Sequence, residues 1–148
     1  MRIATAILCD FAEVRDGLLF VLAGGVNRVF RQTLPAPLSC CLAVLVEVDA
    51  AQLAVPHELR ADLVGPQGQN LAQVRGGFQV GPSPITDPGE GMLIPVALDL
   101  RNVGIQDFGW HRFVLSLDDE AEPDIRFKVA LPPQAGQPQG TGSGRRPN

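Results

Sequence analysis

Apolar and polar residues alternate with a period of two along most of this 148-residue chain. That period is typical of β-strands with one buried face, and the spacing of an amphipathic helix is hard to find. Short turns rich in Gly, Pro and Asp separate the alternating or continuously apolar runs. The pattern predicts strands over residues 3–9, 18–23, 26–31, 38–48, 58–64, 70–80, 92–100, 110–117 and 125–131.

Many short strands without long helices between them favour an all-β fold. We therefore expect a single antiparallel β-sandwich, immunoglobulin-like or jelly-roll-like, of about seven to nine strands. Gly76 and Gly77 weaken one predicted strand, and Pro95 cannot donate a ladder hydrogen bond in another. Both features predict a sheet edge or a bulge, and such an edge is where we expect contact with another chain.

The chain divides into a body and a tail. Residues 1–131 form the predicted sandwich domain, and a chain of this length is most simply one domain. Residues 132–148 contain Ala135 as their only apolar residue, and Pro and Gly supply much of the rest. This composition predicts a disordered, Pro/Gly-rich C-terminal tail.

Charge and cysteine content restrict the partners and the cellular compartment that we expect for this protein. The formal net charge is −4 and the body has no basic block, so neither nucleic acid nor an anionic membrane is expected as a partner. Asp10 and Glu13 follow the first apolar run where a signal peptide would still be hydrophobic. Cys9, Cys40 and Cys41 form no disulfide framework. We expect a cytoplasmic protein whose cysteines are small buried side chains, with Cys40 and Cys41 on opposite faces of a strand.

The paired glycines Gly24 and Gly25 end an apolar run, as the glycines of a phosphate-binding loop do. A phosphate loop needs a helix to follow, whereas residues 26–30 keep the strand period. We interpret Gly24 and Gly25 as a structural turn or bulge that requires a positive φ.

The segment 118–124 is an acidic turn. Calcium prefers several oxygen ligands, so the candidates for a calcium site are Asp118, Asp119, Glu122 and Asp124. Calcium is the alternative here; we favour a solvated hairpin tip whose like charges discourage edge association, and we expect no metal.

The two histidines have different settings. His57 follows Pro56 in a predicted loop, where we expect it to be exposed. Asp107, Gly109 and His111 have the spacing of the Asp-x-Gly-x-Tyr corner of immunoglobulin-type sandwiches, with His111 in the tyrosine position. This spacing predicts a structural turn in which a ring N–H of His111 bonds a backbone carbonyl.

Several short motifs follow one another in an order that resembles a bacterial domain-of-unknown-function family of small standalone proteins, over about residues 2–131. They are Cys9-Asp10, Asp16-Gly17, Gly24-Gly25, the valine-rich run 44–48 and the terminal hairpin from Gly109 to Val129. The resemblance implies a β-sandwich and a bacterial cytoplasmic protein. It assigns no catalytic residue.

No nucleophile, base and orienting group can be assembled from the sequence, and no serine lies in a hydrolase motif. We therefore expect a protein that is not an enzyme and takes no cofactor. The favoured function is an interaction module that binds a protein partner or itself as a homo-oligomer. The alternative is a small-ligand, carbohydrate or calcium-binding sandwich, although one tryptophan and seven phenylalanines leave few aromatic rings for sugar stacking.

Overall fold

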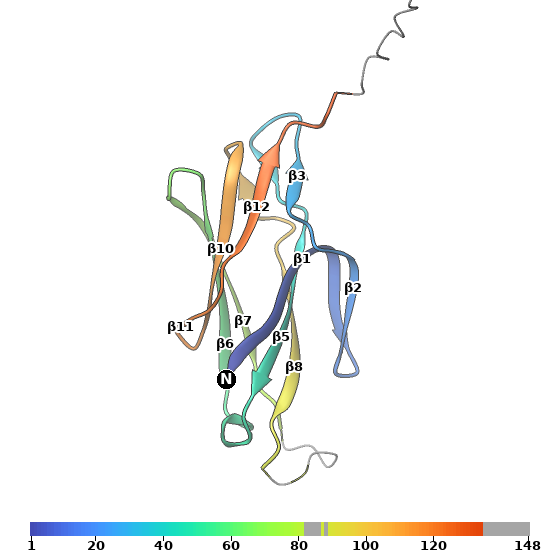
Figure 1. Ribbon diagram of the computed structural model, residues 1–148, viewed down its shortest axis with the longest axis vertical. Coiled ribbons are helices and arrows are strands. Elements are labelled where there is room, and N and C mark those ends of the chain that lie inside the picture. The colour runs from blue at the N-terminus through green and yellow to red at the C-terminus, as the bar shows by residue number, and fades with distance from the viewer. Residues whose placement is uncertain (82–86, 88, 135–148) are drawn as a thin grey trace, which may run out of the picture.

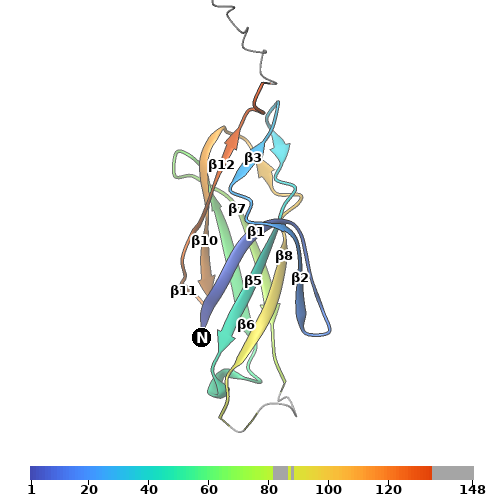
Figure 2. The ribbon, with the colours of Figure 1, turned by 45° about the vertical axis from the view of Figure 1, so that its right-hand side comes forward.

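Two sheets pack face to face in the computed structural model, which describes residues 1–81, 87 and 89–134 (Figures 1 and 2). Sheet A has the strand order β2-β1-β5-β8, and sheet B has the order β3-β12-β10-β6-β7 with β11 beside β10. Every neighbouring pair is antiparallel except β12 with β3. The strands of sheet A are β1 (Arg2–Arg15), β2 (Leu18–Gly24), β5 (Cys41–Val48) and β8 (Met92–Asp99).

The strands of sheet B are β3 (Arg28–Phe30), β6 (His57–Val64), β7 (Asn70–Phe78), β10 (Gly109–Leu117), β11 (Glu120–Ala121) and β12 (Ile125–Ala130). A third, two-stranded ladder joins β4 (Ala36–Pro37) to β9 (Gly104–Ile105). The 3-10 turn η1 (Ala50–Gln52) links β5 to β6. In the part of the chain that the structure describes, no helix is long and apolar enough to span a membrane.

The predicted all-β sandwich is confirmed. Each segment predicted as a strand contains an observed strand of at least three residues. The first strand is longer than predicted. It continues past Cys9 to Arg15, because residues 11–15 keep the alternating pattern and pair with β2. The turn is confined to Asp16 and Gly17, whose φ angles of +51° and +72° suit a tight two-residue hairpin turn.

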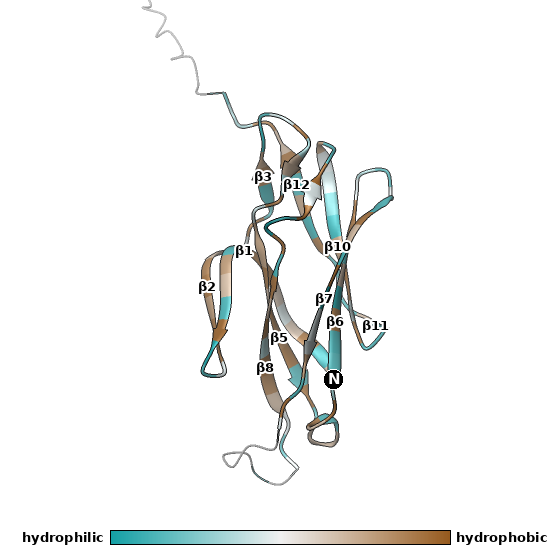
Figure 3. Cartoon of the chain, turned by 180° about the vertical axis from the view of Figure 1, so that it is seen from behind, coloured by the Kyte–Doolittle hydropathy of each residue, from teal (hydrophilic) through white to brown (hydrophobic). Residues whose placement is uncertain are grey.

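The core lies between the two sheets. Strand β5, at the centre of sheet A, contributes Leu42, Val44 and Val46, and sheet B contributes Phe113 and Phe127, all of them fully buried. Each such side chain contributes about 1.5–3 kcal/mol through removal from water. Figure 3 shows apolar residues along β5 and β8 and also along β2, which lies on the outside of the molecule.

The predicted sheet edges are confirmed. Strand β7, with Gly76 and Gly77, is the last strand of sheet B, and β8, with Pro95, is the last strand of sheet A. The sandwich ends with β12 at Ala130. Residues 135–148 of the predicted tail lie outside the described residues.

Candidate functional site

The β1–β2 hairpin carries an apolar face that nothing in the described chain covers. Beyond Cys9, strand β1 pairs only with β2, and the hairpin projects from the side of the sandwich (Figure 1). Phe11 lies opposite Leu22, Glu13 opposite Phe20 and Arg15 opposite Leu18, so these side chains share one face. Its large apolar members are well exposed, with exposed fractions of 40% for Phe11, 63% for Leu18, 46% for Phe20 and 65% for Leu22.

Part of the opposite face anchors the hairpin to sheet A, although Val14 and Val21 on that face are 44% and 39% exposed. Ala12 and Leu19 pack against a small buried cluster of Cys9, Cys41 and Ala43. Cys9 and Cys41 are cross-strand neighbours there, whereas Cys40 belongs to the core between the sheets. The prediction that Cys40 and Cys41 face opposite sides is therefore confirmed.

The thiols are suited to packing rather than reaction. Burial raises the pKa of Cys9, with smaller contributions from Cys41 and Asp10, and it raises the pKa of Cys40 to about 11. Because the thiolate is the reactive form, these thiols are weak nucleophiles.

Strand β2 is an edge strand with unusual composition. Its sequence, Leu18–Gly24, contains no charged residue and no proline. Natural edge strands normally carry charges, prolines or bulges that prevent pairing with another chain. Strand β2 has neither charges nor prolines, so its free edge presents unpaired backbone N–H and C=O groups to another chain.

Gly24 and Gly25 set the base of this hairpin, and no helix begins at Val26. Gly25 has a φ of +90°, and the amides of Gly25 and Val26 both donate to the Leu8 carbonyl, at 2.9 and 3.0 Å. A Cβ at Gly24 would lie 2.8 Å from Cδ1 of Ile7. The chain turns here through the positive φ of Gly25, and the turn carries it from sheet A to β3 of sheet B.

The corner predicted at Asp107, Gly109 and His111 forms at the start of β10. Asp107 accepts a hydrogen bond of 3.1 Å from Gln69, and Gly109 has a φ of +120°. Nδ1 of the buried His111 lies 3.1 Å from the Gly109 carbonyl oxygen, and its ring stacks on Phe127. These contacts fix the backbone at the start of β10. The expected hydrogen bond from the His111 ring to a backbone carbonyl is present.

The acidic turn divides its carboxylates among different partners. Asp118 and Asp119 have φ angles of +47° and +67° and form the tight turn between β10 and β11. Arg60 donates a hydrogen bond to Asp119, and Arg112 donates one to Asp124, each at 2.8 Å. Glu122 accepts a hydrogen bond from the Ile3 amide at 3.1 Å. Within residues 1–81, 87 and 89–134, no group of three or more His, Cys, Asp or Glu residues is placed to hold a metal ion. The geometry gives the calcium alternative no support.

Asp118 instead binds His57, which is buried and not exposed as predicted. His57 begins β6, and its Nδ1 lies 2.7 Å from Oδ2 of Asp118 while its Nε2 lies 2.8 Å from the Gln52 carbonyl oxygen. Burial lowers the pKa of His57, but the bonds to Gln52 and Asp118 outweigh it, so the pKa is raised. Two acceptors around one ring favour the doubly protonated imidazolium.

A second surface feature lies on the outer face of sheet B. We call it the basic platform, and it consists of Arg28 on β3, Arg126 and Lys128 on β12, and Trp110 and Arg112 on β10. Their neighbours Val29, Phe127, Val129 and His111 are buried in the core, which leaves these five side chains on the outside. Sequence reasoning missed this feature because the residues come from three distant segments.

Taken together, the fold and its exposed features define an all-β sandwich whose candidate sites are open surfaces, an apolar edge hairpin and a basic platform. The chain belongs to the family of unknown function DUF6941, whose model matches residues 4–130. The match runs from β1 to the end of β12 and confirms the predicted membership of a domain-of-unknown-function family. Comparison with curated proteins and with solved structures finds no significant match.

Proposed function

We propose that this protein is a non-catalytic interaction module of the bacterial cytoplasm, and that it binds a second copy of itself through β2. The observation that carries the proposal is the uncharged, proline-free and exposed edge strand Leu18–Gly24. An open strand edge gains backbone hydrogen bonds when another strand joins it. The three free, buried cysteines of the described chain support a reducing compartment.

The sequence of β2 is complementary to itself. An antiparallel pair with a two-fold axis at Val21 would place Leu18 opposite Gly24 of the second copy and Phe20 opposite Leu22 of the second copy. Every pair in that register is apolar, so no like charges face each other across the axis. The pairing would join the two A sheets into one continuous sheet with closed two-fold symmetry.

The sheet edges at β8 and β7 are less suited to this contact. Strand β8 contains Pro95, which cannot donate to a new ladder. Strand β7 carries Arg75, which pairs with Glu58, and Gln73, which donates to Asp62. Polar side chains of this kind discourage edge-to-edge pairing, so β2 is a better candidate than the two edges that the sequence predicts.

Light scattering after size exclusion, over a range of protein concentrations, tests the proposal. The wild-type chain of 15.8 kDa should approach twice that mass as concentration rises. Leu22→Lys should weaken association by at least about tenfold, because each two-fold contact then buries two lysines. Leu22 is well exposed, so the thermal midpoint of the monomer should hardly change.

Leu93→Lys is the matched control. Leu93 is a leucine of similar exposure, 53%, on the other edge strand of sheet A. The Leu93→Lys variant should associate like the wild type. A wild-type protein that stays monomeric at the highest concentration, or equal losses in both variants, would overturn the proposal.

A further inference from the structure

The cations of this acidic protein are unevenly paired. The body, residues 1–131, contains ten basic and sixteen acidic residues, since two of the twelve basic residues are Arg145 and Arg146. Most of the ten have a carboxylate partner; these are Arg2, Arg15, Arg60, Arg75, Arg101 and Arg112. Arg31 donates to backbone carbonyls of Phe30, Pro37 and Leu38.

Arg28, Arg126 and Lys128 form no ion pair with any described residue, and all three belong to the basic platform. Lys128 lies opposite Arg28 on one side, and Arg126 lies opposite Arg112 on the other. Like charges directly opposite each other on neighbouring strands are destabilising. An anion bound between them would remove this repulsion, so the platform has an electrostatic reason to bind one.

The platform also offers an aromatic and apolar contact. Trp110 is 56% exposed, and Nζ of Lys128 lies 6.0 Å from the centre of its ring. Beside it, a shallow pocket of about 250 Å³ is lined by Arg112 and Arg126 and by the turn from Val64 to Gly68. The guanidinium of Arg112 donates a hydrogen bond of 2.8 Å to the carboxylate of Asp124. Trp and Arg are among the side chains that most often dominate binding energy at protein interfaces.

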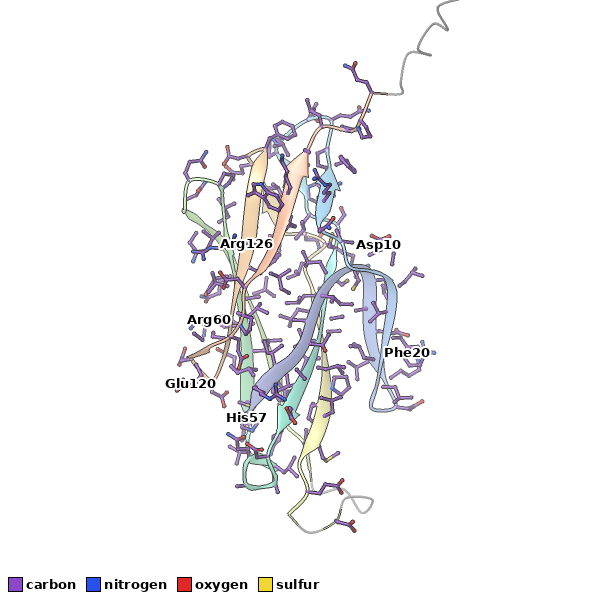
Figure 4. All side chains as sticks on the ribbon, viewed as in Figure 1. Asp10, Phe20, His57, Arg60, Glu120 and Arg126 are labelled. Carbon is purple, nitrogen blue, oxygen red and sulfur yellow. The ribbon has the colours of Figure 1, made fainter. Side chains whose placement is uncertain are left out.

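We propose that the basic platform binds a short acidic segment of a protein partner, with its carboxylates on Arg112, Arg126, Lys128 and Arg28 and an apolar side chain against Trp110. Figure 4 places Arg126 on the sheet B side and Phe20 of the hairpin on the opposite side, so this surface is separate from the proposed self-association edge.

Charge complementarity favours a short segment over a long polyanion. The platform is local, and the acidic excess of the rest of the body would repel a nucleic acid strand that extends beyond it. A few carboxylates fit within one Debye length, about 8 Å at physiological salt, of the platform cations. Two neighbouring strands are about 4.8 Å apart, so the platform spans β3, β12 and β10 within roughly 10 Å.

The single tryptophan of the chain provides the test, because Trp110 lies in the platform. Titration with an oligoglutamate peptide that contains one leucine should change the Trp110 emission saturably at low salt, and added salt should weaken the binding. Arg126→Glu should weaken it by about tenfold, since one attraction is lost and one repulsion is added.

Arg101→Glu changes the net charge equally but alters an exposed ion pair outside the platform, and it should bind as the wild type does. Trp110→Phe, followed by peptide anisotropy, should retain most of the binding, and Trp110→Ala should not. Leu22→Lys should bind the peptide normally, which separates this proposal from self-association. No saturable change with the wild type, equal losses in the two arginine variants, or tighter binding of an oligothymidylate of equal charge would each overturn the proposal.

Discussion

At the scale of single residues, the contact between His57 and Asp118 links two segments that are far apart in the chain. The two residues are 61 positions apart, and the contact ties the start of β6 to the tight turn after β10. Asp118 also accepts from the Glu58 amide at 2.8 Å. Burial raises the pKa of Asp118, but the Glu58 amide and His57 outweigh it, so the pKa is lowered. One carboxylate thus satisfies a buried ring and a backbone donor.

The opposite shifts of the two pKa values define a pH window. The raised pKa of His57 means that its stabilisation is complete below about pH 6.5 and is lost as the pH rises through the folded-state value. The lowered pKa of Asp118 means that its stabilisation is present above about pH 3.9 and is lost as the pH falls through its folded-state value. The pair therefore stabilises the fold most between roughly pH 4 and 6.5.

Asp118→Asn tests this window. Asparagine tolerates the positive φ of the turn but removes the charge, so the free energy of unfolding should fall by about 1–2 kcal/mol near pH 5.5 and by less near pH 8.5. Urea unfolding at both pH values measures the difference. Glu120→Gln in the same hairpin should have little effect at either pH. A loss of equal size at both pH values would show that the imidazolium contributes nothing.

At the scale of elements, the close approach of the two edge strands depends on one glycine. A Cβ at Gly76 on β7 would lie 2.5 Å from Cδ2 of Leu98 on β8, a side chain that is itself buried. A Cβ at Gly77 would have its nearest contact at 3.9 Å, with the His57 carbonyl oxygen. Adjacent glycines in one strand therefore face different constraints, since neighbouring side-chain directions point to opposite faces.

The two glycines form a matched pair of substitutions. Gly76→Ala should lower the free energy of unfolding by about 1–3 kcal/mol, because Leu98 must move within a packed core. Gly77→Ala should be neutral or should stabilise by up to about 1 kcal/mol, because alanine restricts the unfolded chain. Chemical denaturation of both variants gives the comparison. Equal effects would mean that β7 and β8 are not packed as closely as described.

At the scale of the whole molecule, the two sheets share one core. Leu42 of sheet A and Phe113 and Phe127 of sheet B are buried in the same cluster. Neither sheet can bury its apolar face without the other, and a body of this size has room for a single core.

Cooperative unfolding follows from this shared core. Leu42→Ala on β5 should cost about 2–5 kcal/mol, and it should shift the Trp110 fluorescence transition in sheet B together with the circular dichroism transition. Leu131→Ala, at an exposed position, should change the free energy of unfolding by less than about 0.5 kcal/mol. Two separate transitions in the Leu42 variant would contradict a single cooperative unit.

The strands, the turn at Gly24 and Gly25, and the corner at Asp107 to His111 were predicted from the sequence because each depends on residues close together in the chain. A period of two and a glycine with positive φ are local properties of the backbone. The apolar run ends at Cys9 and predicts the end of the first strand there, but the residues after Asp10 keep the strand pattern and pair with β2.

Only the tertiary structure decided which distant residues meet. The burial of His57 depends on a carboxylate 61 residues away, and the row from Arg28 through Lys128 to Trp110 depends on β3 lying beside β12. Strand order also decided that β2 is an edge and that its apolar face stays uncovered. Alternation along a strand determines which side chains share a face, but the pairing of strands determines which faces and charges become neighbours.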